Sequence, residues 1–315
     1  MYKIEKLKKW GLLLLLMASL VQTSCNTEDS LAIPASDYVI QSPLTQRIVD
    51  SSGLIARVFH DTMFQVAEGV KEIDIHYLSQ RGYSTRVYIL QVAVDNPSVR
   101  LIAGMPFGAT TLTGNMQPLP EMAKYYDSAG QHVVGGVNAD FFDRATGVPR
   151  GVLIVNGQLL KDSWFNERSA TFVGVLKDGS PIIGTRDDFD RLQDQLQYAV
   201  GAGQLLVQNH QMVSDIPIYT EIAPRTGAGL AAQDTLYFAV ADGRNFYWSN
   251  GLEVPELGQL LRACGAQIAV NMDGGGSSTF LIRNPLAPVL QVRNKPSDGN
   301  NRPLGDGWLV ISTEK

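Results

Sequence analysis

One stretch of the sequence combines a carboxylate, three glycines and three hydroxyl side chains. It reads Asn271-Met272-Asp273-Gly274-Gly275-Gly276-Ser277-Ser278-Thr279. Consecutive glycines weaken regular secondary structure by roughly 0.5–1 kcal/mol each, so they indicate a backbone that approaches another group closely. Backbone N–H groups in such a loop can cradle an anion, and the three hydroxyls add hydrogen-bond donors. A tight turn between two strands is the alternative interpretation, and the lack of a following Gly-Lys-[Ser/Thr] disfavours a nucleotide P-loop.

A second Asn-x-Asp segment, Asn138-Ala139-Asp140, occurs in a similar setting. Each segment ends an expected strand that follows an expected helix and a glycine, Gly130 in one case and Gly265 in the other. Convergence of two unrelated helix–strand units is the alternative. Either way two carboxylates arrive at strand ends, where sheets tend to form ligand crevices. Asp273 is therefore the first candidate for a catalytic carboxylate and Asp140 the second, with Asn138 expected to bind a sugar hydroxyl or to orient Asp140.

Three arginines are candidates for phosphate binding, because guanidinium binds phosphate in a two-pronged geometry that Lys cannot copy. Arg225 lies between a proline and the small residues 226–229, and a surface salt bridge is its alternative role. Asp242 and Arg244 occur in an Asp-Gly-Arg segment, which is also an ordinary turn signal. Arg302 ends a polar loop, where it either faces the site or structures the loop.

Seven stretches, taken in order, resemble the phosphodiester glycosidase family over about residues 88–311. They are Val137-Asn138-Ala139-Asp140-Phe141-Phe142, Gly151-Val152-Leu153-Ile154-Val155-Asn156-Gly157, Gly201-Ala202-Gly203-Gln204-Leu205-Leu206-Val207, Pro224-Arg225-Thr226-Gly227-Ala228-Gly229, Val240-Ala241-Asp242-Gly243-Arg244, the Asn271–Thr279 stretch, and Asn300-Asn301-Arg302-Pro303. The resemblance implies hydrolysis of the bond between a sugar, N-acetylglucosamine being one candidate, and a phosphodiester. Such chemistry needs a carboxylate near the anomeric carbon and donors on the phosphate. Asp140 departs from many relatives of the family, which carry a small residue at that position.

The expected partner is a sugar phosphodiester or a phosphorylated glycan. One alternative is a non-catalytic envelope module that binds phosphorylated glycans, which would keep its function without Asp273. Another is a metal-dependent phosphodiesterase that cuts the P–O bond, although paired metal ions about 3.5–4 Å apart need more clustered ligands than this sequence offers. We expect no cofactor and no metal site, because the four histidines have no ligand-like spacing. Nucleic acid is not an expected partner, since the net charge is −5 and the basic residues are scattered.

The first residues resemble a secretory signal. Four lysines precede an apolar run from Trp10 to Leu20, which is too short to span a bilayer. Cys25 after Ser24 resembles a bacterial lipoprotein processing site, although Gln22 stands where Leu is usual, and a plain cleaved signal is the alternative. We expect an exported protein that the lipid on Cys25 anchors in the cell envelope, at the periplasm or outer membrane. The lipid would be its only membrane contact.

The remaining sequence predicts an α+β fold with a mixed, strand-rich sheet core, a few flanking helices and a single main domain. Ten strands are expected between residues 85 and 312, and Asn156-Gly157 is a strong hairpin signal. Helices are expected over 120–129, 188–198 and 255–264. The expected divisions are a signal over 1–25, a tether over 26–39, an N-terminal strand-rich segment over 40–105 and the glycosidase domain over 106–315.

Overall fold

The computed structural model describes residues 38–164, 171–214 and 221–313, and the described residues form one compact unit. The expected signal, Cys25 and most of the tether lie outside the described residues. Of the last two tether residues, Tyr38 is bound to the fold while Val39 is exposed. The Tyr38 hydroxyl donates to a carboxylate oxygen of the buried Asp61 at 2.8 Å.

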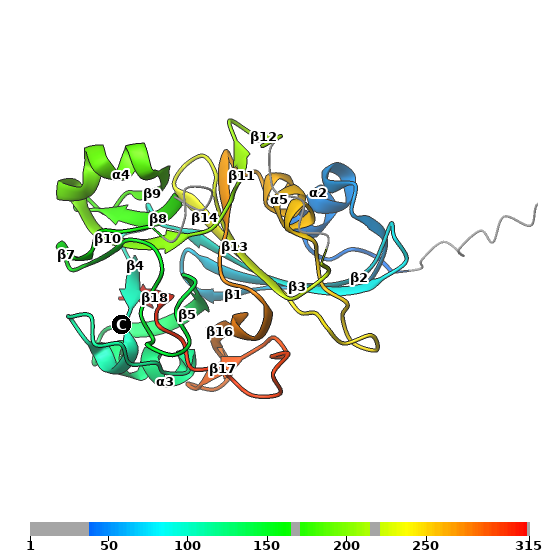
Figure 1. The fold of residues 1–315 in the computed structure, drawn as a ribbon. Coiled ribbons are helices and arrows are strands. Elements are labelled where there is room, and N and C mark those ends of the chain that lie inside the picture. Colours follow the sequence, from blue (N-terminus) through cyan, green and yellow to red (C-terminus); the bar gives the residue numbers. More distant parts are fainter. Residues whose placement is uncertain (1–37, 165–170, 215–220, 314–315) are drawn as a thin grey trace, which may run out of the picture. The chain divides into compact units, whose positions relative to one another are not determined.

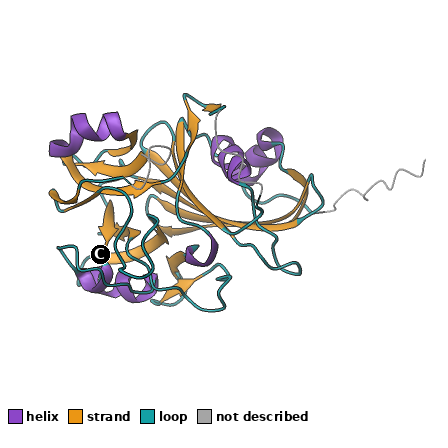
Figure 2. Cartoon of the chain, in the orientation of Figure 1, coloured by secondary structure: helices purple, strands orange, loops and turns teal. Residues whose placement is uncertain are grey.

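Three antiparallel sheets make up most of the unit (Figures 1 and 2). The largest has eight strands in the order β1 (Ile55–Ala67), β2 (Val70–Ser79), β3 (Ser84–Ala93), β14 (Thr235–Ala241), β13 (Arg225–Leu230), β15 (Ile268–Asn271), β11 (Leu205–Gln208) and β12 (Gln211–Met212). The second has the order β7 (Gln158–Lys161), β6 (Leu153–Val155), β10 (Leu196–Ala202), β8 (Thr171–Leu176) and β9 (Pro181–Thr185). The third has the order β17 (Leu290–Val292), β16 (Phe280–Arg283), β5 (His132–Asn138), β18 (Gly307–Ser312) and β4 (Val99–Gly104).

Four α-helices flank these sheets in the part of the chain that the structure describes. They are α2 (Pro43–Ser52), α3 (Leu119–Ala123), α4 (Arg186–Leu192) and α5 (Val254–Ala263). Single 3-10 turns occur at η1 (Pro106–Gly108), η2 (Lys124–Tyr126), η4 (Gln193–Gln195) and η5 (Gly275–Ser277). No helix within 38–164, 171–214 or 221–313 is long and apolar enough to cross a membrane.

The hydrophobic core lies on both faces of the eight-stranded sheet. Helices α2 and α5 lie side by side over one face (Figure 1), where Ile48, Leu257 and Leu261 are fully buried. The other face packs against the two smaller sheets around Phe238, Trp308 and their neighbours. Burial of this apolar surface is the main stabilising contribution to the fold.

The structure confirms the expected α+β class and the hairpin at Asn156-Gly157. The backbone dihedral φ is 52° at Asn156 and 74° at Gly157, and β6 pairs antiparallel with β7 across this turn. Two helix predictions were too long. The helix expected over 120–129 ends with η2 at Tyr126, and the one expected over 188–198 gives way to strand β10 at Leu196. In β10, Leu196 and Ala199 are buried and contribute to the core, so packing overrides the local helical pattern.

The segment expected as an N-terminal unit over 40–105 is continuous with the rest of the fold. Strand β3 pairs with β14 along Val87–Ala93, and β4 pairs with β18. Helix α2, which the sequence reading did not anticipate, begins at the N-cap Ser42, whose hydroxyl accepts hydrogen bonds from two backbone N–H groups.

Candidate active site

The two Asn-x-Asp segments meet where strands β5 and β15 end. The Asp273 N–H donates to the Ala139 carbonyl at 3.0 Å. In return the Asn138 side-chain amide donates to the Asp273 carbonyl at 2.6 Å. The Asn138 side-chain oxygen accepts from the Thr226 hydroxyl at 2.9 Å and from the Thr279 N–H at 3.0 Å. Asn138 thus ties together strands from two sheets and fixes the backbone of Asp273, which places both segments at one site.

Three carboxyl groups gather at this junction. Asp273 is partly buried, while Asp140 and Asp306 are 4% and 2% exposed. Asp306 accepts a hydrogen bond from the Asp140 N–H at 2.9 Å, and Asp140 accepts one from the Gly151 N–H at 2.6 Å. Burial raises the pKa of Asp273 to about 6 and that of Asp306 to about 7. Burial and then repulsion from Asp306 raise the pKa of Asp140 well above its usual value.

The surroundings of the three carboxyl groups differ. Burial raises the pKa of each, but Ser277 and Gly274 donate hydrogen bonds to Asp273 and Arg302 and Arg150 attract its negative charge, so its pKa rises only to about 6. Asp273 is therefore mainly ionised at pH 7, whereas burial and the charges of Asp306 and Asp273 favour the protonated form of Asp140. Carboxyl groups whose environments separate their pKa values can serve as base and acid in one site.

The glycines after Asp273 allow two arginines to approach the loop. Gly275 has a φ of 60°, and a Cβ atom there would lie 3.0 Å from the Arg244 guanidinium. A Cβ atom on Gly276 would overlap both Arg302 and Asp298. Arg302 donates to the Ser277 hydroxyl at 3.1 Å and pairs with Asp298 at 2.7 Å, while Arg244 pairs with Glu221 at 2.8 Å. Two arginines therefore flank the loop, and Arg302 also acts on the Asp273 carboxylate.

The expected anion cradle of successive backbone N–H groups does not form in this loop. Gly275 donates its N–H to the Pro224 carbonyl at 2.9 Å, and Ser277 and Ser278 donate theirs to carbonyls inside the loop at 3.2 Å. Gly274 donates to the Asp273 carboxylate. These N–H groups are engaged within the protein, so the arginine side chains are the better candidates for holding a phosphate.

Comparison with known proteins agrees with this arrangement. The family model for phosphodiester glycosidases matches residues 131–311. The chain belongs to the phosphodiester glycosidase family. Its site residues Asn138, Asp140, Asp273 and Arg302 all lie within the matched segment.

Individual relatives are distant. The mouse N-acetylglucosamine-1-phosphodiester alpha-N-acetylglucosaminidase is 26% identical over 168 residues, which cover 48% of this chain and 32% of the mouse protein. The chain thus spans about a third of the length of the curated relative it matches. The zebrafish catalytic domain of that enzyme, auto-inhibited by its pro-peptide, shares the fold with a TM-score of 0.57 at 17% identity. That match covers 81% of this chain and 88% of the zebrafish domain. A hypothetical protein from Synechocystis also has a TM-score of 0.57, at 14% identity, with 80% and 64% covered.

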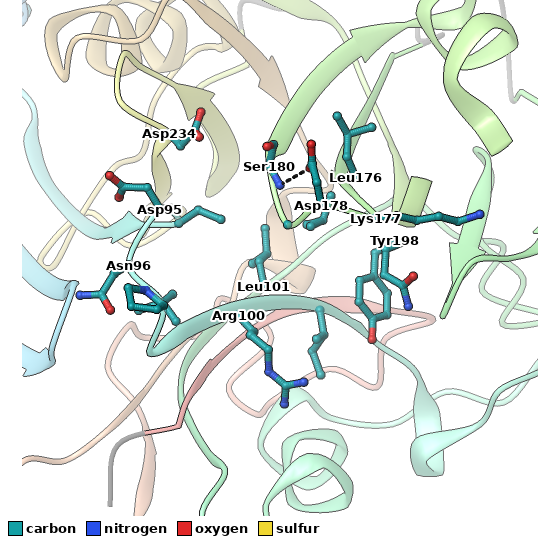
Figure 3. Close-up of a pocket in the computed structure, with 17 residues that line it drawn as sticks. Asp95, Asn96, Arg100, Leu101, Leu176, Lys177, Asp178, Ser180, Tyr198 and Asp234 are labelled. Atoms are coloured by element: carbon teal, nitrogen blue, oxygen red, sulfur yellow. Dashed lines mark hydrogen bonds between the residues drawn. The ribbon is translucent and has the colours of Figure 1, made fainter. Parts of the chain in front are cut away.

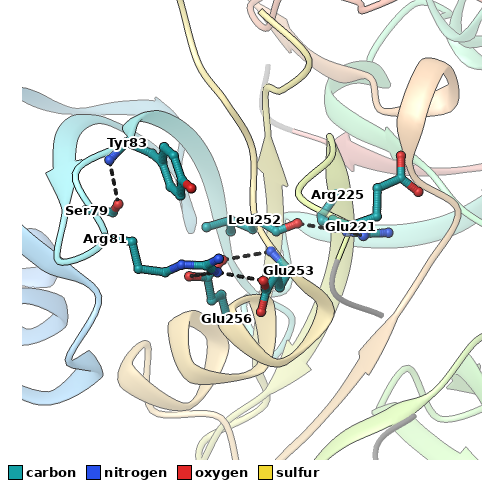
Figure 4. Close-up of polar contacts among 8 residues, drawn as sticks. All are labelled: Ser79, Arg81, Tyr83, Glu221, Arg225, Leu252, Glu253 and Glu256. Carbon is teal, nitrogen blue, oxygen red and sulfur yellow. Dashed lines mark hydrogen bonds and ion pairs between the residues drawn. The ribbon is translucent and has the colours of Figure 1, made fainter. Parts of the chain in front are cut away.

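The structure does not bring Arg225 to this site. Side chains alternate along β13, and Thr226 faces Asn138 while Arg225 points to the opposite face of the sheet. There Arg225 donates to the carbonyl oxygens of Leu252 at 3.0 Å and Glu221 at 2.6 Å (Figure 4). Arg225 thus holds the start of β13 to neighbouring loops, and of the three candidate arginines it is Arg302 and Arg244 whose side chains lie against the glycine loop.

Two other family-motif residues support the site without facing Asp273. The buried Asp242 carboxylate accepts from the Trp248 indole N–H at 2.7 Å, from the Lys295 N–H at 2.9 Å and from Asn294 at 3.2 Å. Asn294 in turn donates to the Ser278 carbonyl at 3.0 Å. The Asn271 side chain donates to Gln204 at 2.9 Å. These contacts fix the loops around the glycines and are structural.

Three site residues were missed by the sequence reading: Asp306, Arg150 and Lys161. Asp306 stands between two glycines at the start of the last strand, and Arg150 directly precedes Gly151, so both belong to stretches that looked like turns. Lys161 donates to the carbonyls of Arg150 at 2.9 Å and Gly151 at 3.0 Å, and its charge acts on Asp140. The glycines on either side of Asp306 indicate a position where the chain packs closely. The sequence does not show which residues pack against it.

A separate cavity of about 430 Å³ lies far from the three carboxyl groups (Figure 3). It is lined by residues such as Arg100 and Leu176, which are at the opposite ends of β4 and β8 from the strand ends that reach the site. It holds none of Asp140, Asp273 and Asp306. The cavity is lined by other carboxylates, Asp95, Asp178 and Asp234, but none of these belongs to the stretches that resemble the family, so we place the chemistry at Asp273 and Asp140. No group of three or more His, Cys, Asp or Glu side chains among the described residues is arranged to hold a metal ion.

Proposed function

We propose that this protein hydrolyses the bond between the anomeric carbon of a sugar and a phosphodiester, with Asp273 as the catalytic carboxylate. The observation that carries the proposal is the position of Asp273, which lies beside the buried Asp140 and Asp306 and directly before the glycines that Arg302 and Arg244 approach. This arrangement matches the charges of the reaction, which are positive at the sugar ring and negative on the phosphate.

In the reaction the bond between the anomeric carbon and the bridging oxygen breaks. The electron pair leaves with the oxygen, which becomes part of a phosphomonoester, and a water molecule supplies the hydroxyl group of the released sugar. The Asp273 carboxylate stabilises the positive charge that develops at the anomeric carbon. Arg302 and Arg244 lower the energy of the departing phosphate by pairing with its oxygens. A phosphomonoester is a good leaving group, so one carboxylate supplies a large part of the catalysis.

An α-linked N-acetylglucosamine phosphodiester is the first substrate to test, because the mouse relative carries that activity in its name. We expect the unsubstituted protein to release free N-acetylglucosamine from UDP-N-acetylglucosamine. We expect Asp273→Asn to lose at least 100-fold in rate, as removal of one electrostatic stabiliser typically costs 10²–10³. Full turnover by a folded Asp273→Asn protein would exclude the role assigned to this carboxylate.

Hydrolysis in ¹⁸O-labelled water identifies the bond that breaks. Cleavage at the anomeric carbon places the label in the sugar, whereas cleavage of the P–O bond places it in the phosphate. Label in the phosphate would favour a phosphodiesterase. Binding of the diester without turnover, unchanged in Asp273→Asn, would favour a non-catalytic module that binds phosphorylated glycans.

We also propose that the protein is exported and anchored in a bacterial envelope by a lipid on Cys25. The support is the sequence of residues 1–25 alone. Incorporation of labelled palmitate into the full chain, and its loss in Cys25→Ser, tests the anchor. A processed but unlabelled protein would instead indicate a plain cleaved signal.

A further inference from the structure

Asp306 is the most enclosed charged side chain of the candidate site and is not part of the family motifs described above. It lies directly before β18 and is 2% exposed. One carboxyl oxygen, Oδ1, accepts the Asp140 N–H at 2.9 Å. The other, Oδ2, is buried without a hydrogen-bond partner. A carboxylate buried with one oxygen unpartnered is unfavourable and calls for an explanation beyond packing.

Asp140 is held beside Asp306 by contacts to its carboxyl group and to its backbone. Its Oδ2 atom accepts the Gly151 N–H at 2.6 Å. The same oxygen lies against the backbones of Gly151 and Gly201, where added Cβ atoms would come within 3.2 Å and 2.9 Å of it. The two glycines therefore form a close wall against Oδ2, and the contact to Asp306 holds the Asp140 backbone.

The positive charges around Asp140 and Asp306 do not balance two negatively charged carboxylates. Asp273 repels both Asp140 and Asp306, and Asp306 repels Asp140. Lys161 attracts Asp140, but its ammonium group already donates to three carbonyl oxygens. Arg302 and Arg150 act on Asp273. Close carboxyl groups with this balance cannot both be ionised near neutral pH, so one of them keeps a proton.

We propose that Asp306 is a positioning residue that keeps Asp140 protonated, so that Asp140 can donate a proton to the oxygen that leaves the sugar. In this step the bond between the anomeric carbon and the bridging oxygen breaks, the proton moves from Asp140 to that oxygen, and Asp140 becomes a carboxylate. Water supplies the proton that restores Asp140 after the product leaves. The proposal rests on the proposed function and adds an acid to the Asp273 carboxylate.

Asp306→Asn separates the charge of Asp306 from its contacts. The asparagine oxygen can still accept the Asp140 N–H, so the backbone stays in place while the negative charge disappears. Without that charge the ionised form of Asp140 is less unfavourable, and the pKa of Asp140 falls. Asp306→Ala removes both the charge and the hydrogen-bond acceptor. The difference between the two variants is the effect of releasing the Asp140 backbone.

Carbon-13 NMR of protein labelled at the aspartate carboxyl carbon measures this pKa directly in the full chain. The Asp140 signal is identified by its loss in Asp140→Asn. We expect its titration midpoint to fall by at least one pH unit in Asp306→Asn. Asp178→Asn, in an exposed turn, is the matched control for loss of one negative charge and should leave the midpoint in place. An unchanged midpoint in Asp306→Asn, or an Asp140 already ionised at pH 7 in the unsubstituted protein, would overturn the proposal.

The pH dependence of kcat/KM supplies the functional readout. We expect the alkaline limb to move to lower pH by at least one unit in Asp306→Asn, which is about a tenfold loss above the limb. The acid limb, set by Asp273, should stay near its original position. A merely structural role for Asp306 would lower activity at every pH without moving either limb, and that result would refute the proposal. Failure of the unsubstituted protein to release sugar would count against the proposed function, while the NMR titration would still decide the protonation of the pair.

Discussion

Asp273→Asn should stabilise the protein at alkaline pH while it removes activity. Burial is the largest cause that raises the pKa of Asp273 to about 6 from its ordinary value of 3.8. A group whose folded pKa is raised contributes stability that is complete below about pH 4 and is lost as pH rises through 6. The asparagine variant has no such loss, because its side chain stays neutral throughout.

The magnitude follows from the shift. The difference 6 − 3.8 is 2.2 pH units, and at 1.36 kcal/mol per unit this gives about 3 kcal/mol. We expect a somewhat smaller effect of about 2 kcal/mol, because Asp273 is partly exposed and an amide replaces the hydrogen bonds of Ser277 and Gly274 less well than a carboxylate. The variant should therefore match the unsubstituted protein at pH 4 and exceed its free energy of unfolding by about 2 kcal/mol at pH 8.

Urea unfolding at pH 4, 6 and 8 measures this difference, with equal m-values as the check that both proteins unfold in the same way. Asp178→Asn serves as the control, because hydrogen bonds from Ser180 lower the pKa of Asp178 and its variant should show no gain at pH 8. A difference between Asp273→Asn and the unsubstituted protein that is the same at pH 4 and pH 8 would refute the reasoning. That result would mean that ionisation of Asp273 does not reduce the stability of the folded protein.

Three further outcomes follow from single contacts. Arg302→Gln should raise KM for a sugar phosphodiester by at least tenfold, since it removes a cation beside the Ser277 hydroxyl, whereas Arg225→Gln should lower stability and leave KM within a factor of about three. Steady-state kinetics on folded variants separates the two, and equal effects on KM would contradict the placement of Arg225. Asn138→Ala should cost about 2–4 kcal/mol in urea unfolding, because it leaves buried partners of three hydrogen bonds unsatisfied; a loss below 1 kcal/mol would contradict the role of Asn138 as a link between sheets. Gly276→Ala should reduce kcat/KM by at least tenfold, because its methyl group would displace Arg302; unchanged kinetics would show that the glycine is dispensable.

The sequence singled out the Asn271–Thr279 stretch as a candidate site because its signals are local. Three adjacent glycines after Asp273 and the two Asn-x-Asp segments can be read without knowing which strands pair. The strand-rich α+β class could be predicted for the same reason, since alternation and turn residues are properties of short windows. Helix ends were less predictable, because the change from helix to strand at Leu196 depends on burial of that residue in the core.

The orientation of arginines could not be read from the sequence. Arg225 and Thr226 are neighbours in a family motif, yet strand alternation sends one side chain to Leu252 and the other to Asn138. The motif shows that Arg225 and Thr226 share a strand, but it does not fix the strand's register. A shift of one residue would exchange the faces to which the two side chains point. Asp306 was missed for a related reason, since its partner Asp140 is 166 residues away in the chain.

The site lies where the ends of strands from different sheets converge. This position accounts for the hydrogen bonds that hold the site together and for the repulsion among its carboxyl groups. Asn138 can hold the Asp273 carbonyl, Thr226 and Thr279 only because three strand ends come together there. The same convergence brings Asp140, Asp273 and Asp306 into one poorly solvated region, where their ionisation is mutually unfavourable. Unfavourable ionisation reduces stability as pH rises, but it also favours the protonated form of one carboxyl group beside an ionised one. If the proposed chemistry is correct, variants that relieve this repulsion should gain stability and lose acid catalysis together, since both effects arise from the same buried charges.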